Sequence, residues 1–417
     1  MRYSLFGEKL TARSGILQLM EDLGHALARP GKVYMLGGGN PAHIPQMDAV
    51  WRSRMEAILR DGDSFEHMVA DYDAPRGKES FLEAVAGFLR EEYGWDIGPE
   101  NVAITNGSQS AFFFLFNMFA GPRADGTTRK ILLPVVPEYV GYADQGIEND
   151  MFVGARPTID TIDAHTFKYH VDFDHLVIDE SIAAVCVSRP TNPTGNVLTD
   201  DEVERLSDIA RQNDIPLLID NAYGMPFPGI IFSDVSPIWR PGIILSMSLS
   251  KLGLPGVRTG IVVADSPIIE ALSGVNAIAS LANGSLGQVL TEPLFRDRTI
   301  LTLSREVVRP FYERRAAQAR EWISQYFPAD LDYSIHSSEG SIFLWIWFRA
   351  LSADSAELYR RLKERGVIIV PGEYFFFGID EDWGHSRQCI RLNYCHNEQD
   401  VRAGIRIIGD EARRLSA

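Results

Sequence analysis

The chain contains Ala183-Ala184-Val185-Cys186-Val187 and Leu217-Leu218-Ile219, two short and continuously apolar runs. Between them, Thr199 and Glu202 have the spacing of a capping box, in which each side chain satisfies a backbone N–H at the start of a helix. Apolar residues then recur with helical spacing from Val203 to Ala210. This stretch predicts a strand–helix–strand unit whose strands are buried.

Four further runs of the same kind lie on either side of this unit: Val102-Ala103-Ile104, Ile131 to Val136, Ile243-Ile244-Leu245 and Ile261-Val262-Val263. Continuous rather than alternating hydrophobicity is typical of strands covered on both faces, as in a mostly parallel sheet flanked by helices. We therefore expect an α/β fold with a large domain over residues 48–299.

The pattern changes after Pro310. The pieces there are a polar helix over residues 313–326, an aromatic strand over 342–348, a helix over 356–365 closed by Gly366, and an amphipathic segment over 401–415. They predict a smaller α+β domain over residues 300–417. Residues 1–47 have no strand–helix alternation of their own, so we expect them to join this domain.

Composition excludes several classes of protein. The 417 residues are 45% hydrophobic and 23% charged, as in ordinary globular proteins. The net charge of −16 repels nucleic acid and anionic membranes, so neither is expected as a partner. The three cysteines form no zinc pattern, and the first residues lack the pattern of a signal peptide. We expect reduced thiols, no metal and a cytoplasmic location.

A polar turn, Thr105-Asn106-Gly107-Ser108-Gln109-Ser110, follows the first strand and precedes an apolar helix. Free N–H groups and the positive end of the helix dipole make such a turn a candidate anion site. By itself the turn is better explained as an ordinary capped helix, because Ser and Asn are favoured caps.

Lys251 lies in a second polar loop, from Ser248 to Gly260, and Arg258 follows seven residues later. Lysine amines form Schiff bases with carbonyl compounds, and desolvation or a neighbouring cation lowers their pKa. A lone lysine would be interpreted as a surface residue. The glycines and the proline around Lys251 indicate a tightly shaped loop instead.

Two more polar positions follow buried strands. Asp220 ends the strand Leu217 to Ile219 and precedes Tyr223, and Asn192 lies in the turn Pro190 to Gly195 after the strand Ala183 to Val187. Ligands of open α/β sheets bind beyond the carboxyl ends of the strands. At that edge, Asp220 would either cap the next helix or meet a cationic ligand atom. The turn around Asn192 would either take part in ligand binding or be a plain two-proline turn.

The order of these elements resembles the class I and II aminotransferases of pyridoxal-phosphate (PLP) fold type I. The matching positions are Asn106 to Ser110, Tyr139, Asn192-Pro193-Thr194-Gly195, Asp220 with Tyr223, Ser248-x-Ser250-Lys251 and Arg258. The match continues in Gly39-Asn40-Pro41, Tyr72 and Arg391, so it covers nearly the whole chain. The resemblance implies a PLP-dependent transferase fold and an aminotransferase activity.

The resemblance also implies a role for each position. Pyridoxal 5′-phosphate would be the cofactor, with Lys251 as its covalent anchor and the carrier of a substrate proton, and Asp220 at its pyridine nitrogen. Its phosphate would be held by Ser108, Gln109, Ser248 and Arg258, and by Tyr72 of the neighbouring subunit of a homodimer with shared sites. Asn192 and Tyr223 would donate to its phenolate oxygen, Tyr139 would stack on its ring, and Gly39, Asn192 and Arg391 would bind the substrate carboxylate.

Within the family, the resemblance points to exchange of the amino group of valine, or of a similar small neutral amino acid, with pyruvate. One alternative is another PLP-dependent aminotransferase, or a lyase, acting on a different small amino acid, because the cofactor residues are common to both. A non-catalytic, ligand-sensing domain is disfavoured, because Lys251 and Asp220 are both kept and no helix-turn-helix is appended.

Two local points stay open at this stage. Many relatives have a Gly-x-Gly-Ala-like phosphate turn where this chain has Gly107-Ser108-Gln109-Ser110, so the side-chain contacts of the turn are undetermined. The aromatic run Tyr374 to Phe377 is either substrate pocket or core, with core slightly favoured.

Overall fold

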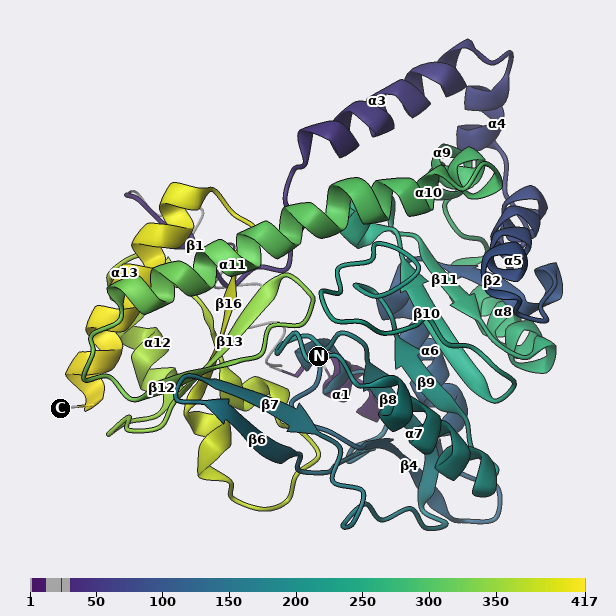
Figure 1. Ribbon diagram of the computed structural model, residues 1–417. Helices are drawn as coiled ribbons and strands as arrows, with labels where there is room; N and C mark the ends of the chain where they lie inside the picture. The colour runs from purple at the N-terminus through teal and green to yellow at the C-terminus, as the bar shows by residue number, and fades with distance from the viewer. Residues whose placement is uncertain (1, 13–23, 25–30, 417) are drawn as a thin grey trace.

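The computed structural model describes residues 2–12, 24 and 31–416 (Figure 1). Its larger sheet has eight strands in the order β2-β11-β10-β9-β8-β4-β3, with β5 beside β4. The strands are β2 (Val102–Thr105), β3 (Gly121–Pro122), β4 (Thr128–Leu133), β5 (Phe152–Gly154), β8 (Ile182–Ser188), β9 (Leu217–Asp220), β10 (Ile243–Ser248) and β11 (Gly260–Val263).

Most of this sheet is parallel, as the continuous apolar runs predict. β5, β4, β8, β9 and β10 pair in parallel, and β11 is antiparallel to both β10 and β2. Because β11 reverses between two antiparallel pairings, β2 runs in the same direction as β10. The carboxyl ends of β2, β8, β9 and β10 therefore meet at one edge of the sheet, and the α/β class is confirmed.

Helices cover both faces of the larger sheet (Figure 1). They include α5 (Glu79–Tyr93), α6 (Ser108–Phe119), α7 (Asp200–Gln212), α8 (Ser266–Ser280) and α9 (Leu286–Arg296). The predicted capping box is confirmed, since the Glu202 N–H donates to Thr199 Oγ1 at 3.1 Å and the Thr199 N–H donates to Glu202 Oε2 at 2.8 Å. It sets the start of α7, which packs on β8 and β9.

A second sheet has six strands in the order β15-β16-β13-β12-β7-β6. The strands are β6 (Thr158–Asp163), β7 (Thr166–His170), β12 (Tyr333–His336), β13 (Phe343–Phe348), β15 (Val370–Pro371) and β16 (Cys389–Asn393). The hairpin β6–β7 comes from within the predicted large domain, yet β7 pairs in parallel with β12, with Thr166 opposite Ile335. The domain boundaries at 47/48 and 299/300 stay predictions.

Helices and one short strand pair complete the second part. They are α12 (Ser355–Glu364), α13 (Glu398–Ser416), β1 (Tyr34–Met35) and β14 (Val367–Ile368), and β1 pairs with β14. Three more helices belong to the first part of the chain: α1 (Leu5–Leu10), which precedes β1, and α3 (Pro45–Arg60) and α4 (Ser64–Ala70), which follow it.

A long helical run passes both sheets. It consists of α10 (Thr299–Thr302), a π-helical segment (Leu303–Val308) and α11 (Arg309–Tyr326). Figure 1 shows it extending from α9, beside the larger sheet, to α13, beside the second. Among the residues described, no helix combines the length and apolarity needed to cross a membrane.

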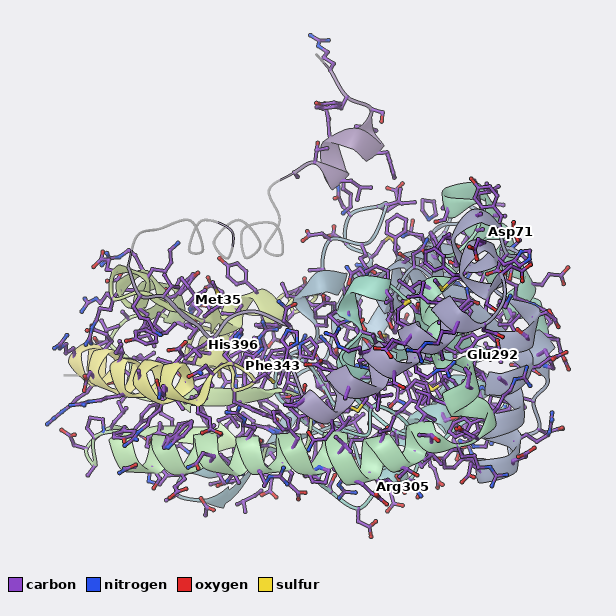
Figure 2. The ribbon with its side chains drawn as sticks, turned by 90° about the horizontal axis from the view of Figure 1, so that it is seen from above. Met35, Asp71, Glu292, Arg305, Phe343 and His396 are labelled. Atoms are coloured by element: carbon purple, nitrogen blue, oxygen red, sulfur yellow. The ribbon has the colours of Figure 1, made fainter. Side chains whose placement is uncertain are left out.

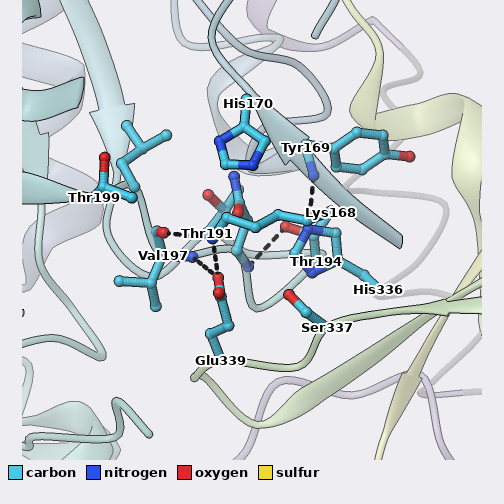
Figure 3. A network of polar contacts seen from close by, with 12 residues as sticks. Lys168, Tyr169, His170, Thr191, Thr194, Val197, Thr199, His336, Ser337 and Glu339 are labelled. Carbon is cyan, nitrogen blue, oxygen red and sulfur yellow. Dashed lines mark hydrogen bonds and ion pairs between the residues drawn. The ribbon is translucent and has the colours of Figure 1, made fainter. Parts of the chain in front are cut away.

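A polar network ties the second sheet to the turn after β8 (Figure 3). Lys168 of β7 is buried, and its Nζ donates to Glu339 and, at 3.0 Å, to the carbonyl of Val197. Glu339 Oε2 also accepts from the Val197 N–H at 3.1 Å. Because Val197 lies five residues beyond Asn192, the network braces a turn that carries a predicted site residue.

We predict that Glu339→Ala lowers the free energy of unfolding by about 2–3 kcal/mol, because it leaves the Lys168 ammonium and the Val197 N–H without their acceptor. Urea denaturation followed by circular dichroism measures this change. Glu381→Ala is the control, since it removes an exposed ion pair with Arg156 and should change the stability by only about 0.5 kcal/mol. Equal losses in the two variants would contradict a bracing role for Glu339.

Candidate active site

One cavity of about 680 Å³ lies at the edge of the larger sheet where the four carboxyl ends meet. Eleven of the twelve predicted site residues line it, and Tyr72 is the exception. The register explains why they converge, because Ser188 is paired with Asp220, Asp220 with Ser246, and Ser248 with Gly260. Arg391 reaches the same cavity from β16 of the second sheet, so the site lies between the two parts.

Asp220 lies at the carboxyl end of β9. Its Oδ2 accepts a hydrogen bond from the Tyr142 hydroxyl, and its Oδ1 accepts from the Ala222 N–H at 2.9 Å. Burial raises the pKa of Asp220, while the bond from Tyr142 acts in the opposite direction. The charge of Lys251 also lowers the pKa of Asp220, and a cationic ligand atom at contact distance would favour the charged form of the carboxylate further.

Lys251 follows β10 in a short 3₁₀ turn (Ser250–Leu252). Its Nζ donates to the Gly39 carbonyl at 2.7 Å and lies 5.1 Å from the centre of the Tyr223 ring. Desolvation lowers the pKa of Lys251 to about 8. The neutral amine, which is the form that attacks a carbonyl group, is therefore formed more readily near neutral pH than in an ordinary lysine.

The start of α6 and Arg258 form an anion cradle. Ser108 and Gln109 are the first residues of α6, where backbone N–H groups precede the intrahelical hydrogen bonds. Gly107, with φ 85°, lies so close to Arg258 that a Cβ added to it would fall 2.3 Å from the Arg258 Nη2 atom. The Gln109 amide is turned away to the Gly141 carbonyl at 3.2 Å, which leaves the backbone of the turn as its contribution to the cradle.

Arg391 is held on the opposite wall. Its Nη1 donates to Asn192 Oδ1 at 2.7 Å, and its Nη2 donates to the Gly37 carbonyl at 2.6 Å. The guanidinium carbon lies 4.1 Å from the centre of the Phe343 ring. Burial lowers the pKa of Arg391 to about 10, so the side chain stays cationic at neutral pH. A buried cation with a fixed fork is suited to binding a carboxylate.

Two tyrosines and Ser248 complete the predicted set. Tyr223 is buried, with its ring edge-on to Phe343 at 6.0 Å, and Tyr139 lies edge-on to Tyr142 at 5.2 Å. The hydroxyl of Ser248 accepts from the Ser250 N–H at 3.1 Å, which shapes the turn that carries Lys251.

Tyr72 lies elsewhere, with 83% of its surface exposed. Figure 2 shows the neighbouring residue Asp71 at the right-hand end of the molecule, whereas Met35 and His396, which line the cavity, are labelled left of the centre, well away from Asp71. The predicted contact of Tyr72 with the phosphate of a neighbouring subunit is therefore not tested by a single chain.

Sequence reasoning missed two polar residues of this region. Tyr142 donates to Asp220, and Glu138 is a fully buried carboxyl group beside Tyr139. Burial raises the pKa of Glu138 to about 8, against the opposing hydrogen bonds from Ser188 and Tyr139. A signal was present in the sequence, because Glu138 and Tyr142 flank Tyr139 just after the apolar run Ile131 to Val136.

The run Tyr374 to Phe377 supplies core, since Phe375 and Phe376 are buried against Trp345.

These donors suit a phosphorylated pyridine aldehyde: an amine for the aldehyde, a carboxylate for the ring nitrogen, and an anion cradle with Arg258 for the phosphate. Fold and site thus define a pyridoxal-phosphate-dependent enzyme of fold type I. The family model for aminotransferase class I and II matches residues 36–408, and the chain belongs to that family, whose cofactor is pyridoxal 5′-phosphate.

Individual relatives agree with this classification. The chain is 51% identical to the valine–pyruvate aminotransferase of Escherichia coli K12, over 100% of this chain and 99% of the relative. The crystal structure of valine–pyruvate aminotransferase from Salmonella typhimurium LT2 superimposes with a TM-score of 0.89 and 49% identity, covering 96% of this chain and 99% of that chain. The kynurenine aminotransferase of Pyrococcus horikoshii, solved with PMP, shares the fold at 21% identity and a TM-score of 0.80, covering 99% and 97%.

We predict that Gly107→Ala weakens the retention of pyridoxal phosphate about tenfold or more, because the added Cβ displaces the Arg258 guanidinium from the cradle. Equilibrium titration of the cofactor, followed by absorbance, measures this effect. Gly126→Ala is a matched control: its φ is 82°, and a Cβ there would meet nothing within 4 Å. It also places an alanine at positive φ, without the collision, so similar cofactor binding by the two variants would argue against the cradle.

Proposed function

We propose that the protein transfers the amino group of valine, or of a similar small neutral amino acid, to pyruvate, giving 3-methyl-2-oxobutanoate and alanine. The observation that carries the proposal is the buried Arg391. Among the described residues that line the cavity, the lysine and arginine side chains are Lys251, Arg258 and Arg391. With Lys251 and Arg258 given to the cofactor, one cation remains for one carboxylate, which fits a neutral amino acid and a monocarboxylic oxo acid.

The likeness to relatives supports the same substrate pair. Two relatives that match along nearly the whole chain at 51% and 49% identity are valine–pyruvate aminotransferases. At this identity over the full length, the cavity walls of this chain and of those relatives are built from corresponding elements.

The residues of the chain have separate tasks in this reaction. Bound pyridoxal phosphate supplies an aldehyde that combines with amines and a conjugated ring that accepts electron density as the substrate Cα–H bond breaks. Lys251 would hold the cofactor through its Nζ, and the same amine, when free, would carry the proton between the substrate Cα and the cofactor's C4′ carbon. Its lowered pKa suits this exchange, because a base poised near the working pH both takes and returns a proton.

Asp220 keeps a proton on the ring nitrogen, and the Tyr142 hydroxyl fixes the orientation of its carboxylate. The Asn192 amide has its oxygen engaged by Arg391, which leaves its Nδ2 group free to donate to the phenolate oxygen of the ring. Tyr223 donates to the same oxygen, and Tyr139 packs on the ring face. The α6 N-terminus, Ser248 and Arg258 hold the phosphate, and Arg391 binds the substrate carboxylate with Asn192 and the Gly39 backbone.

The enzyme works, in this proposal, as a homodimer with shared sites in the cytoplasm. An exposed apolar surface lies at the end of α8, where Ile278 is 91% exposed and Leu281 is 59% exposed. The bond from Ser285 Oγ to Asp73 Oδ2, at 2.6 Å, holds the Tyr72 loop near this surface. A second copy would cover it and bring Tyr72 to the partner's phosphate. The three cysteines are buried free thiols, as suits a reducing compartment.

We predict that valine with pyruvate has a kcat/KM at least about 100-fold above aspartate or glutamate with 2-oxoglutarate, because a second buried carboxylate lacks a cation and costs several kcal/mol. Valine should exceed 2-aminobutyrate by about 10- to 200-fold at most, since one methylene contributes about 1–3 kcal/mol. Steady-state kinetics across an amino-donor panel measures both ratios. Release of ammonia in place of stoichiometric alanine would favour the lyase alternative, and preferred dicarboxylates would overturn the substrate assignment.

Arg391→Ala should weaken all amino acid substrates together in the same panel, with Arg387→Ala as a control. Arg387 is a partly exposed arginine of the segment before β16, paired with Asp382. Selective loss of a single donor in Arg391→Ala would contradict a general carboxylate site.

We predict that mixing a Tyr72→Phe chain with a Lys251→Ala chain restores activity that neither has alone. In the mixed dimer, the site with an intact Lys251 receives an intact Tyr72 from the other chain. Differently tagged chains allow the mixed dimer to be purified and its turnover compared with each parent. A purified mixed dimer without recovered activity would exclude a shared site.

A further inference from the structure

Glu138 is a buried carboxyl group that the proposed reaction does not use. It follows β4, none of its surface is exposed, and it does not line the cavity. In the described part of the chain, Glu138 takes part in no ion pair. A buried carboxyl group without a cation costs free energy, so its hydrogen bonds have to account for its presence.

Three donors converge on the two oxygens of Glu138. Oε1 accepts from the Ser188 N–H at 2.8 Å, and Oε2 accepts from the Ser188 hydroxyl at 2.7 Å and from the Tyr139 N–H at 3.0 Å. The backbone N–H of Glu138 donates to the Phe375 carbonyl at 2.9 Å. The Phe375 ring lies 5.2 Å from the guanidinium of Arg391. One residue therefore contacts three segments of the active site.

Two of these segments, those of Ser188 and Tyr139, carry a residue that meets cofactor or substrate in the proposed function. Ser188 ends β8, lies opposite Asp220 in the register, and accepts from Thr191 Oγ1 at 3.0 Å, next to Asn192. Tyr139 opens the turn whose Tyr142 donates to Asp220. Glu138 thus fixes the distance between the turn that carries Tyr139 and the strand end that leads to Asn192.

We propose that Glu138 is a positioning residue of this active site, which joins Tyr139 to Ser188 and so sets the spacing between the aromatic ring and the strand ends that enclose the cofactor. The inference rests on the proposed function, since it assigns Tyr139 and Asn192 to the cofactor. It goes beyond that function by adding a residue that contacts neither cofactor nor substrate.

The requirement is for a carboxyl group and not for its shape alone. Both oxygens accept a backbone N–H, one from Ser188 and one from Tyr139, and backbone donors cannot turn away. A carboxyl group accepts at both oxygens in either protonation state, whereas an amide nitrogen has no acceptor site. Glu138→Gln therefore places an NH₂ group against one of the two N–H donors in either orientation of the amide.

The test compares Glu138→Gln with Glu202→Gln in the holoenzyme. Glu202 is a matched control, because it is also buried and also accepts a backbone N–H at each oxygen, from Val171 at 3.1 Å and from Thr199 at 2.8 Å, away from the cavity. We expect both variants to lower the melting temperature. Glu138→Gln alone should raise the dissociation constant of pyridoxal phosphate and lower kcat, each by about 10- to 100-fold. It alone should also move the visible absorption maximum of the bound cofactor.

Cofactor affinity and the absorption maximum are measured without an amino acid, so they report on Glu138 even if valine proves a poor donor. Ser188→Ala serves as a second variant, because it removes one of the three donors and keeps both backbone contacts; it should shift the same quantities in the same direction by less. If Glu138→Gln fails to fold, Ser188→Ala carries the test. The proposal would be overturned if a folded Glu138→Gln variant had the same cofactor affinity, absorption maximum and kcat as Glu202→Gln. It would also be overturned if Ser188→Ala had the wild-type values of these three quantities.

Discussion

The register of β8, β9 and β10 is the constraint on which the site depends. Ser188, Asp220 and Ser246 are lateral neighbours in the sheet, so the end of each strand is fixed relative to the next by backbone hydrogen bonds. A shift of one residue in any of these pairings would turn Asp220 to the opposite face of the sheet. The close packing on both faces of these strands opposes that shift, because each buried side chain would have to fit the space of a different neighbour. Packing of the core therefore also positions the carboxylate.

Charge is managed locally in a chain that is acidic as a whole. The net charge of −16 gives the molecule no general attraction for anions, and the positive groups of the cavity come from particular elements: the α6 N-terminus, Arg258, Lys251 and Arg391. Desolvation lowers the pKa of Lys251 to about 8 and the pKa of Arg391 to about 10. The pKa of Lys251 therefore lies close enough to neutral pH for its amine to exchange a proton. Arg391 stays charged and can only bind an anion. The same physical effect thus separates a base from an anchor.

The sequence allowed the architecture and eleven residues of the cavity lining to be predicted, because both depend on local patterns. Strands buried on both faces have continuous apolar runs, and polar residues just after such runs, such as Asp220 and Asn192, mark strand ends. The contact of Tyr142 with Asp220 could not be predicted in this way, since it joins residues 78 positions apart. The sequence analysis did not predict the hairpin β6–β7 for another reason. β6 is almost wholly exposed, so its sequence has little apolar pattern to detect. The roles of the individual site residues stay predictions.

The helical run of α10, the π-helical segment and α11 has a mechanical consequence. The run lies beside both sheets, so a rotation of one sheet against the other would have to bend it. In the segment Leu303–Val308 the hydrogen bonds span five residues in place of four, so the winding is wider there than in the α-helix on either side. Bending is easiest where the winding changes. A rotation of one sheet against the other would therefore bend the run first in these six residues, which lie outside the cavity lining.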